Sequence, residues 1–412
     1  MRSQADSYGV MVGIANGKEI YSLVTIADEN RHKLLRRSVA GAFSSNATLD
    51  YEPHIDRSIE DLLQVLGTDR VVDVSAKFAY YTMDAAGRFS FGQPLGCLAA
   101  NDDAGGRIAL IRERSRHWAR WGSLPGLERL IFRNPIAMRM KRAPSSMASL
   151  AMQLLKERDE KSPGPSDTPD LMTRFLEARK GQPETLDKAA VAGLLMSTVS
   201  GAGDTTATAL TAILFFLLKD PSTFAKLEEE IRTSDLHKPI PAFIQVSKLP
   251  YLHAVMREGM RLFPVLTMPI ERKVPAGGAS IAGTYFPEGT SVGCMQSAMH
   301  RNPKVFGEDA GLFRPERWLE ADAERLRAME VAHMGFSRGR RLCIGMHIAV
   351  MQMKKVIPTL IMGFEVSLSF LSKVKFAFCS LLDTDGSSRS AWLIRTLRSR
   401  DNLTVLLLAR SH

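Results

Sequence analysis

The feature that most constrains the fold is a long, largely apolar segment with helical periodicity over residues 185–218. It stops at Asp220-Pro221, a pair that ends helices. At 1.5 Å per residue, a helix of this length spans on the order of 50 Å, enough to cross a whole domain. Its most apolar run, TALTAILFFLL at 208–218, falls short of the roughly 18 apolar residues that a membrane-spanning helix needs. The segment therefore predicts a helix that crosses one domain.

Shorter helical patterns lie on both sides of this segment, and strand-like patterns are confined to one region late in the chain. Residues 277–299 combine β-branched alternation with glycine turns, which is typical of short strands. The Pro-, Ser- and Asp-rich segment 162–170 predicts a linker that is too short to separate independent domains. We therefore expect a mainly α fold with a small β region, organised as a single domain over residues 1–412. Further helices are predicted over 29–38, 51–66, 108–122, 148–161, 221–233, 251–263 and 344–361.

Composition and charge exclude some classes of function. Lys and Arg exceed Asp and Glu by 54 to 44, a formal charge of +10, which suits solubility, an anionic membrane surface or an acidic protein partner. The sequence has no zinc-ligand spacing, RNP pattern or dense basic run with interleaved aromatics, so we expect no nucleic-acid partner. Cys97, Cys294, Cys343 and Cys379 form neither a CxxC pair nor a disulfide framework, which indicates a reducing compartment.

Residues 333–345, HMGFSRGRRLCIG, place two reactive side chains in one glycine-rich loop. Residues 335–339 spell G-x-S-x-G, the pattern of a nucleophile elbow. An elbow needs a buried strand before Ser337, and an Asp and a His in order after it. Here the preceding residues are polar and helix-like, and only His347 and His412 follow. We therefore do not expect Ser337 to be a nucleophile.

Cys343 directly precedes a strongly helical segment, where unpaired N–H groups and the helix dipole stabilise a thiolate. The glycines of the loop permit tight turns and close approach of the backbone to a flat ligand. Arg341 could meet an anionic group on that ligand, and Phe336 could cover the sulfur. Two alternatives stay open from the residues alone, a small buried thiol and a pair with His347. The loop favours a thiolate that binds a metal.

The pattern Phe336-x-x-Gly339-x-Arg341-x-Cys343-x-Gly345 matches, position for position, the haem-binding loop of the cytochrome P450 family. The chain resembles this family, and most closely its fungal pisatin-demethylase type. The resemblance implies the cytochrome P450 fold and haem b, with Cys343 as the axial ligand of the iron. It also implies that Phe336, Arg341 and Gly345 contact the haem.

Two further motifs resemble a charge network of the same family. Glu258-Gly259-Met260-Arg261 resembles the family's E-x-x-R, and FRPERW resembles a segment whose arginine here is Arg317. The resemblance implies that Glu258, Arg261 and Arg317 form a buried network that braces the haem loop. Taken alone, Glu258 and Arg261 could equally form a surface helix pair worth tenths of a kcal/mol.

The segment GAGDTT at 201–206 resembles the oxygen-handling stretch of the family, with Ala202 where glycine is usual. The resemblance implies that Asp204 and Thr205 deliver protons during oxygen activation. Each glycine inside a helix costs about 1 kcal/mol of stability relative to alanine, so Gly201 and Gly203 need an explanation. The alternative to an oxygen-handling role is that they allow a close helix–helix contact.

Two more stretches resemble parts of the family that bind the haem propionates. HKLLRR, residues 32–37, resembles W-x-x-x-R, with His32 in the tryptophan position and Arg36 matching the arginine. Arg272, in ERKVP, aligns with another arginine of this kind. The resemblance therefore implies that His32, Arg36 and Arg272 bind the carboxylates of the haem.

The function implied by the resemblance is a monooxygenase. Two electrons and dioxygen insert one oxygen atom into a small apolar organic substrate, in secondary metabolism of the fungal type. NADPH-cytochrome P450 reductase is the implied electron donor, docking on a basic face near the haem loop. The implied location is the cytosolic face of the endoplasmic reticulum, with a peripheral membrane contact. The alternatives are a haem-thiolate isomerase or dehydratase, against which Asp204 and Thr205 argue, and a truncated, non-catalytic product.

The resemblance covers about residues 20–368 and has two departures. The family has an anchor and an early β region before the helix that here carries His32, and we expect this chain to lack both, because it begins almost at that helix. Residues 1–22 are too polar for a signal peptide. The segment 372–401 replaces an expected short hairpin near the substrate site. These departures predict a cytoplasmic protein that holds haem weakly or is poorly stable, because missing neighbours expose apolar surface.

Overall fold

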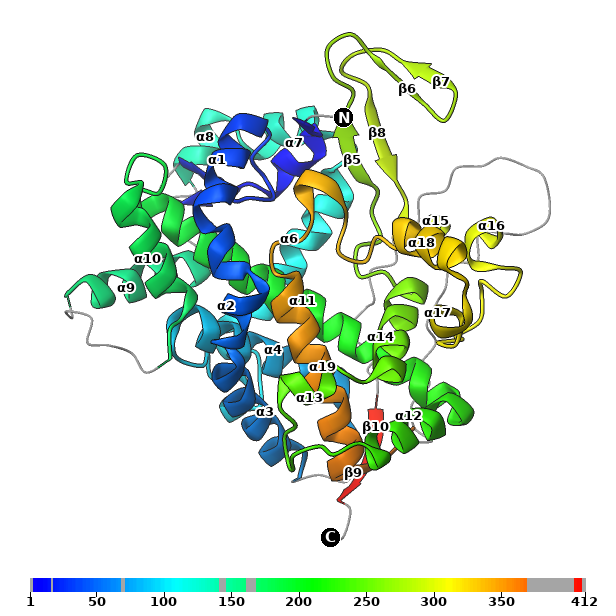
Figure 1. The fold of residues 1–412 in the computed structure, drawn as a ribbon. Coiled ribbons are helices and arrows are strands. Elements are labelled where there is room, and N and C mark those ends of the chain that lie inside the picture. The colour runs from blue at the N-terminus through cyan, green and yellow to red at the C-terminus, as the bar shows by residue number, and fades with distance from the viewer. Residues whose placement is uncertain are drawn as a thin grey trace.

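The computed structural model describes residues 3–15, 18–67, 71–140, 146–160, 168–368 and 404–409. Helices form most of the molecule, and small sheets lie at the top and the bottom of the view in Figure 1. The first half of the chain contains η1 (Asp6–Met11), α1 (Glu29–Val39), η2 (Ala40–Phe43), α2 (Ser45–Leu49), α3 (Glu52–Leu66), α4 (Val74–Phe91), α5 (Cys97–Ala100), η3 (Ala104–Gly106), α6 (Arg107–Trp121), α7 (Pro125–Phe132), α8 (Pro135–Met140), α9 (Ser146–Glu160) and α10 (Leu171–Gly181), where η marks a 3-10 helix. The second half contains α11 (Lys188–Lys219), α12 (Pro221–Thr233), α13 (Phe243–Val246), α14 (Pro250–Leu262), α15 (Gln296–Met299), α16 (Pro303–Phe306), α17 (Arg317–Glu320), α18 (Ala323–Ala332), η4 (Gly339–Arg341) and α19 (Met346–Gly363).

The strands are short and pair antiparallel. One sheet has the order β1 (Ser3–Gln4), β5 (Ile270–Lys273), β8 (Ser291–Cys294), and a second has the order β4 (Val71–Asp73), β10 (Thr404–Ala409), β9 (Phe364–Leu368). Two hairpins complete the set, β2 (Gly13–Ala15) with β3 (Lys18–Ile20), and β6 (Ala279–Ile281) with β7 (Thr284–Phe286). The first sheet joins the start of the chain to the late β region, because Gln4 lies opposite Arg272.

Helix α11 runs through the middle of the helical body, with α19 (orange) beside it in Figure 1. The Asp187 carboxylate caps its start by accepting from the Ala190 N–H at 2.6 Å, and the helix ends before Asp220. It packs against α4, α9, α14 and α19. Among the described ranges it is the one helix long and apolar enough to cross a membrane, yet 56% of its most apolar window is buried inside the molecule.

Two glycines let neighbouring helices approach α11 closely. A Cβ atom on Gly259 of α14 would lie 2.7 Å from Ile213 Cγ1 of α11, and one on Gly203 of α11 would lie 2.1 Å from Met83 Sδ of α4. The Thr82 hydroxyl of α4 also donates to the Gly203 carbonyl at 2.6 Å. Gly203 therefore serves close helix packing, the alternative that the sequence left open for the glycines of this segment.

The expected mainly α fold with a small β region is confirmed. Helix α11 starts and ends within three residues of the predicted 185–218. Helix α4 was not predicted from the sequence, since this helix is buried around most of its circumference and carries no clear apolar stripe. Residues 162–167 of the predicted linker and the segment 372–401 lie outside the described residues.

Candidate functional site

One buried carboxylate, that of Glu258 on α14, accepts hydrogen bonds from two arginines. Arg261 donates to both of its oxygens, at 2.8 and 2.9 Å, and Arg317 Nε donates at 2.8 Å. The Trp318 indole N–H donates at 2.9 Å. The side chains of Glu258 and Arg261 are 0% exposed. The structure thus brings Glu258, Arg261 and Arg317 together in the interior, and the surface-pair alternative for the first two is wrong.

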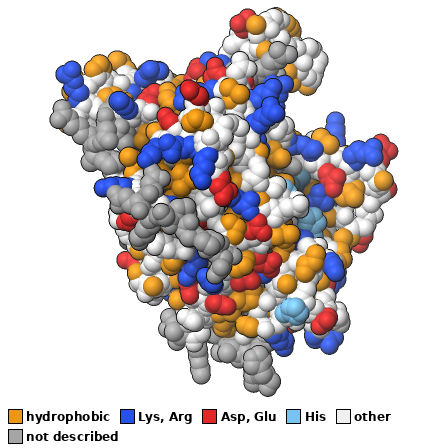
Figure 2. Space-filling model, turned by 60° about the vertical axis from the view of Figure 1, so that its left-hand side comes forward, with side chains coloured by type: hydrophobic (Ala, Val, Ile, Leu, Met, Phe, Trp, Pro, Cys, Tyr) orange, Lys and Arg blue, Asp and Glu red, His pale blue; other side chains and the backbone are white. Residues whose placement is uncertain are grey.

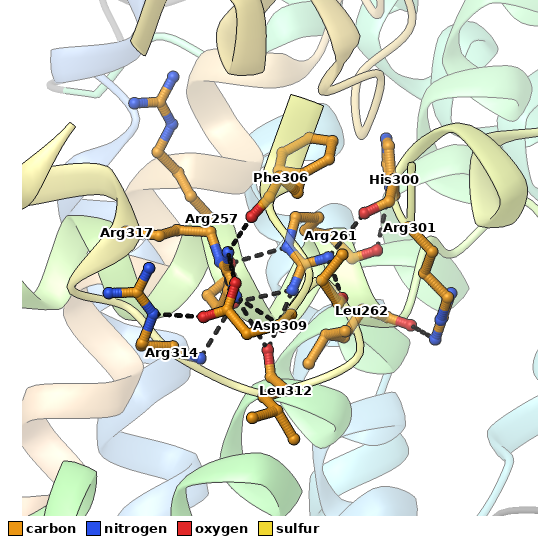
Figure 3. Close-up of polar contacts among 12 residues, drawn as sticks. Arg257, Arg261, Leu262, His300, Arg301, Phe306, Asp309, Leu312, Arg314 and Arg317 are labelled. Atoms are coloured by element: carbon orange, nitrogen blue, oxygen red, sulfur yellow. Dashed lines mark hydrogen bonds and ion pairs between the residues drawn. The ribbon is translucent and has the colours of Figure 1, made fainter. Parts of the chain in front are cut away.

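The two arginines use their remaining N–H groups on the segment 300–312, which has little regular structure (Figure 3). Arg261 Nη1 donates to the carbonyls of His300 and Ala310, each at 2.6 Å. Arg317 donates to the Phe306 carbonyl and to the Asp309 carboxylate, the latter at 3.0 Å. Buried carbonyls outside regular secondary structure need such donors. The cluster therefore fixes the path of the chain that leads toward the loop 333–345.

The loop that carries Cys343 is a compact turn closed by backbone hydrogen bonds. The Ser337 N–H donates to the Met334 carbonyl at 2.8 Å, and the Cys343 N–H donates to the Phe336 carbonyl at 2.9 Å. Gly339 has a φ of +71°, in the left-handed region that glycine adopts without strain. Gly345 then forms the N-cap of α19. Cys343 therefore lies two residues before that cap, where the helix dipole favours a thiolate.

Cys343 is exposed to solvent at the end of the loop. Desolvation by the surrounding protein nevertheless raises the pKa of its thiol, while a backbone hydrogen bond from Gly345 and the charge of Arg36 oppose that rise. The structure thus argues against the alternative of a small thiol packed in the core.

Four basic side chains converge beside this loop. Burial and the nearby charges of Arg341, Arg36 and Arg272 lower the pKa of His32 to about 4. Arg36 Nη1 donates to the Leu342 carbonyl at 2.8 Å, which joins α1 to the loop. Arg341 forms an ion pair with Glu29 at 2.6 Å, whereas Arg36 and Arg272 form no ion pair with a carboxylate of the described residues.

The middle of α11 is open on one side. Gly201 is exposed although it lies at the centre of a core helix, and a Cβ atom there would meet nothing within 4 Å. The Thr205 hydroxyl donates back to the Gly201 carbonyl. Asp204 forms an ion pair with Arg112 of α6, with 3.3 Å between Oδ1 and Nε. The two glycines of the motif therefore differ, since Gly203 packs against α4 and Gly201 borders open space.

These observations fit a haem. An exposed thiol just before a helix offers an iron ligand, and the cations of Arg36 and Arg272, which have no ion-pair partner in the described part of the chain, suit the two propionate carboxylates. The neutral His32 ring can add one hydrogen bond. Gly201 leaves space on the central helix. Phe336 is half-buried in the same loop, and Arg341 is held by Glu29 and two backbone carbonyls, so its path to a propionate is less direct than expected.

Other readings of the loop find no support. The Ser337 hydroxyl is buried without a hydrogen-bond partner among the described residues, so no base is placed to activate it. His347 is exposed at the start of α19. The described part of the chain contains no group of three or more His, Cys, Asp or Glu side chains arranged to hold a metal ion.

Sequence reasoning missed two charged partners in the site. Arg112 and Glu29 pair with Asp204 and Arg341, and the members of these pairs lie 92 and 312 residues apart. A pairing over such a separation leaves no local pattern in a single sequence.

Comparisons with known proteins agree with this geometry. The family profile described as Cytochrome P450 matches residues 7–384. A cytochrome P450 monooxygenase of Aspergillus terreus is 33% identical over 380 residues, which are 88% of this chain and 77% of that protein. The monooxygenase mfmA of Annulohypoxylon moriforme is 29% identical over 85% of this chain and 71% of its own length. The monooxygenase pkfB of Emericella nidulans is 29% identical, with 89% and 73% covered.

We expect Glu258→Gln to destabilise the protein by about 3–5 kcal/mol, because it leaves buried guanidinium groups without their carboxylate. Urea unfolding of the full chain measures this loss. Glu229→Gln is the matched control, since Glu229 and Arg232 have the same i, i+3 spacing on α12 but are exposed. The control should leave the urea midpoint unchanged. Equal urea midpoints for the two variants would show that the buried cluster stabilises the protein no more than the exposed pair does.

Proposed function

The chain belongs to the cytochrome P450 family, and from this premise we propose that it is a haem-thiolate monooxygenase whose iron ligand is Cys343. The observation that carries the proposal is the geometry of the loop, in which the exposed Cys343 lies just before α19, its N–H donates to the Phe336 carbonyl, and Arg36 donates to the neighbouring Leu342 carbonyl. The relatives are fungal proteins named cytochrome P450 monooxygenases, which favours insertion of one oxygen atom from dioxygen into an organic substrate. A small apolar substrate, a pisatin-demethylase type and a place in fungal secondary metabolism remain predictions.

Bound haem b supplies the redox-active iron at which dioxygen is activated. The chain's own contribution begins with holding that group. Cys343 is positioned by its N–H bond to Phe336, and metal binding deprotonates its thiol. Arg36 and Arg272 offer charge to the propionates, and His32 is a buried, neutral hydrogen-bond donor beside them. Gly345 keeps the backbone near the sulfur free of a side chain.

Asp204 and Thr205 are the residues that we expect to move protons. Thr205 donates to the Gly201 carbonyl, so its oxygen keeps lone pairs that can accept a hydrogen bond from water. The Asp204 carboxylate lies next in the chain and pairs with the half-exposed Arg112. A carboxylate that exchanges Arg112 for a water chain can pass protons inward from the surface. General acid work of this kind contributes about 10²–10⁴-fold to a rate.

An electron donor with an acidic surface is expected on the face that carries the loop. Exposed cations lie on α1 and on the loop itself, namely Lys33, Arg37, Arg338 and Arg340. The hydrogen bond from Arg36 to Leu342 places these two elements side by side. Figure 2 shows that basic side chains elsewhere on the visible face are mixed with acidic ones. NADPH-cytochrome P450 reductase is the proposed donor, steered by complementary charge.

A peripheral membrane contact is proposed for α7 and α8. The acid of this region, Glu128, is buried and paired with Arg133, so the exposed charges are those of Arg129 and Arg139. Apolar side chains with flanking arginines suit an anionic lipid surface. The exposed apolar side chains are Leu124, Leu127, Leu130, Ile131, Ile136 and Met140.

The alternative of a haem-thiolate isomerase or dehydratase is not favoured, because the relatives named above are monooxygenases. The alternative of a non-catalytic product is decided by the haem-binding experiments that follow.

We expect Cys343→His to abolish the thiolate-type absorption of the reduced, CO-bound protein, because imidazole lacks the charge that a thiolate donates to iron. Ser337→Ala is the matched change in the same loop and should leave that spectrum intact. If Ser337→Ala lost turnover while keeping its full haem content, Ser337 would again be a candidate nucleophile.

Thr205→Ala should keep NADPH consumption and lower product per NADPH by about tenfold, with the electrons recovered as peroxide, because proton delivery is impaired. Product, peroxide and NADPH are measured in one reaction with the reductase. Thr211→Ala is the control, since Thr211 makes the same backbone bond to Ala207 further along α11. An unchanged yield in Thr205→Ala argues against the assigned role.

The double variant Leu130→Asp, Ile136→Asp should sediment with vesicles of mixed neutral and anionic phospholipid at least tenfold more weakly than the unaltered protein. Each lost apolar contact removes about 1.5–3 kcal/mol. Ile244→Asp changes an exposed apolar side chain of α13 instead and should bind vesicles normally. Equal sedimentation of the two variants would place the contact elsewhere.

A further inference from the structure

The imidazole of His300 connects the buried charge cluster to the loop of Cys343. His300 is 0% exposed. Its Nδ1 lies 3.0 Å from the Arg261 carbonyl oxygen, and its Nε2 accepts the Met334 N–H at 2.8 Å. In return, Arg261 Nη1 donates to the His300 carbonyl at 2.6 Å (Figure 3). The ring therefore has one partner in the cluster and one at the start of the loop.

These partners allow one protonation state of the ring. Met334 N–H is a donor, so Nε2 must be free to accept, and a carbonyl faces Nδ1, so Nδ1 must carry the proton. Protonation of Nε2 would set two donors against each other. Burial, with the charges of Arg261 and Arg301, lowers the pKa of His300 to about 4, which keeps the ring neutral at physiological pH.

The surroundings hold the ring in place. The His333 ring stacks on it, with centroids 5.1 Å apart and an angle of 3° between planes. His333 Nε2 lies 3.2 Å from the Arg257 carbonyl, and burial lowers the pKa of His333 to about 3. The edge of Trp318, which donates to Glu258, packs on His333. One face of the His300 ring is thus covered by His333, which is itself held by Arg257 and Trp318.

From Met334, backbone hydrogen bonds of the loop continue as far as Cys343. The Met334 carbonyl accepts from the Ser337 N–H, and the Phe336 carbonyl accepts from the Cys343 N–H. Met334 is therefore held at both backbone groups, by His300 on one side and by the turn on the other. Losing the His300 acceptor would leave the Met334 N–H without its partner and free the first turn of the loop.

We propose that His300 is a positioning residue that ties the loop of Cys343 to the Glu258–Arg261–Arg317 cluster through its Nε2 acceptor to Met334. The inference rests on the proposed function, because it concerns the loop whose thiolate binds the iron. His300 lies outside the haem-binding motif, and by this proposal it fixes the position of the first turn of the loop that carries the motif.

Two substitutions separate the two nitrogens of the ring. His300→Gln places an amide oxygen near the position of Nε2 and can still accept the Met334 N–H. His300→Asn reaches the position of Nδ1 and loses that acceptor. His54→Gln is the control, because His54 is another buried histidine, on α3. Glutamine is also closer to histidine in size than asparagine is, so His300→Met, which resembles glutamine in length and volume but has no strong acceptor, is included. A role in filling space alone predicts that His300→Met behaves like His300→Gln, whereas loss of the acceptor predicts that it behaves like His300→Asn.

The first readout needs no haem. Hydrogen exchange of the peptide containing Met334, in the full chain with and without haem, should be about tenfold faster in His300→Asn, and within twofold of the unaltered protein in His300→Gln. The second readout is the transfer of haem to apomyoglobin, with the reduced CO spectrum recorded alongside. His300→Asn should release haem about tenfold faster and show a smaller thiolate-type fraction.

The outcomes are distinct. If the unaltered protein shows no thiolate-type spectrum, the proposed function fails, while the exchange data still test the contact. If it shows that spectrum and the glutamine and asparagine variants behave alike, the role of His300 is overturned. Should the asparagine variant fail to fold, the glutamine variant decides, since exchange or haem release well above that of the unaltered protein contradicts the proposal.

Discussion

The arrangement of the second half of the chain depends on one buried carboxylate. Glu258 balances part of the charge of two interior arginines, which in turn donate to carbonyls of a segment with little regular structure. Buried ion pairs are often no more stabilising than apolar side chains of the same size. Their use here is directional, because guanidinium groups hold fixed donor positions. The cluster thus specifies a path that packing alone would leave undefined.

The site forms where this path meets the central helix. After the cluster of Glu258, Arg261 and Arg317, the chain is held at Met334 by His300 and turns at Ser337. Cys343 then lies just before the start of α19. Helix α11 gives close packing at Gly203 and open space at Gly201. One motif therefore serves two physical needs, and the cost of glycine in a helix is explained at both positions.

Part of this could be predicted from sequence. Periodicity located α11 and the amphipathic helices, and the pattern around Cys343 identified the loop because its five fixed positions fall within ten residues. Helix α4 was missed because burial on most sides removes the apolar stripe. The pair of Arg112 with Asp204 and the role of His300 were missed for another reason. Each depends on residues brought together only by folding, and neither partner is marked by local spacing.

The central claim is that the sulfur of Cys343 binds the haem iron. X-ray absorption at the iron edge of the haem-loaded, full-length protein tests it most directly, since it reports the atoms bound to the metal. We predict the pyrrole nitrogens and a single sulfur in the first coordination shell. A shell of nitrogen and oxygen alone, in protein that has bound haem in equal amount, would contradict the account.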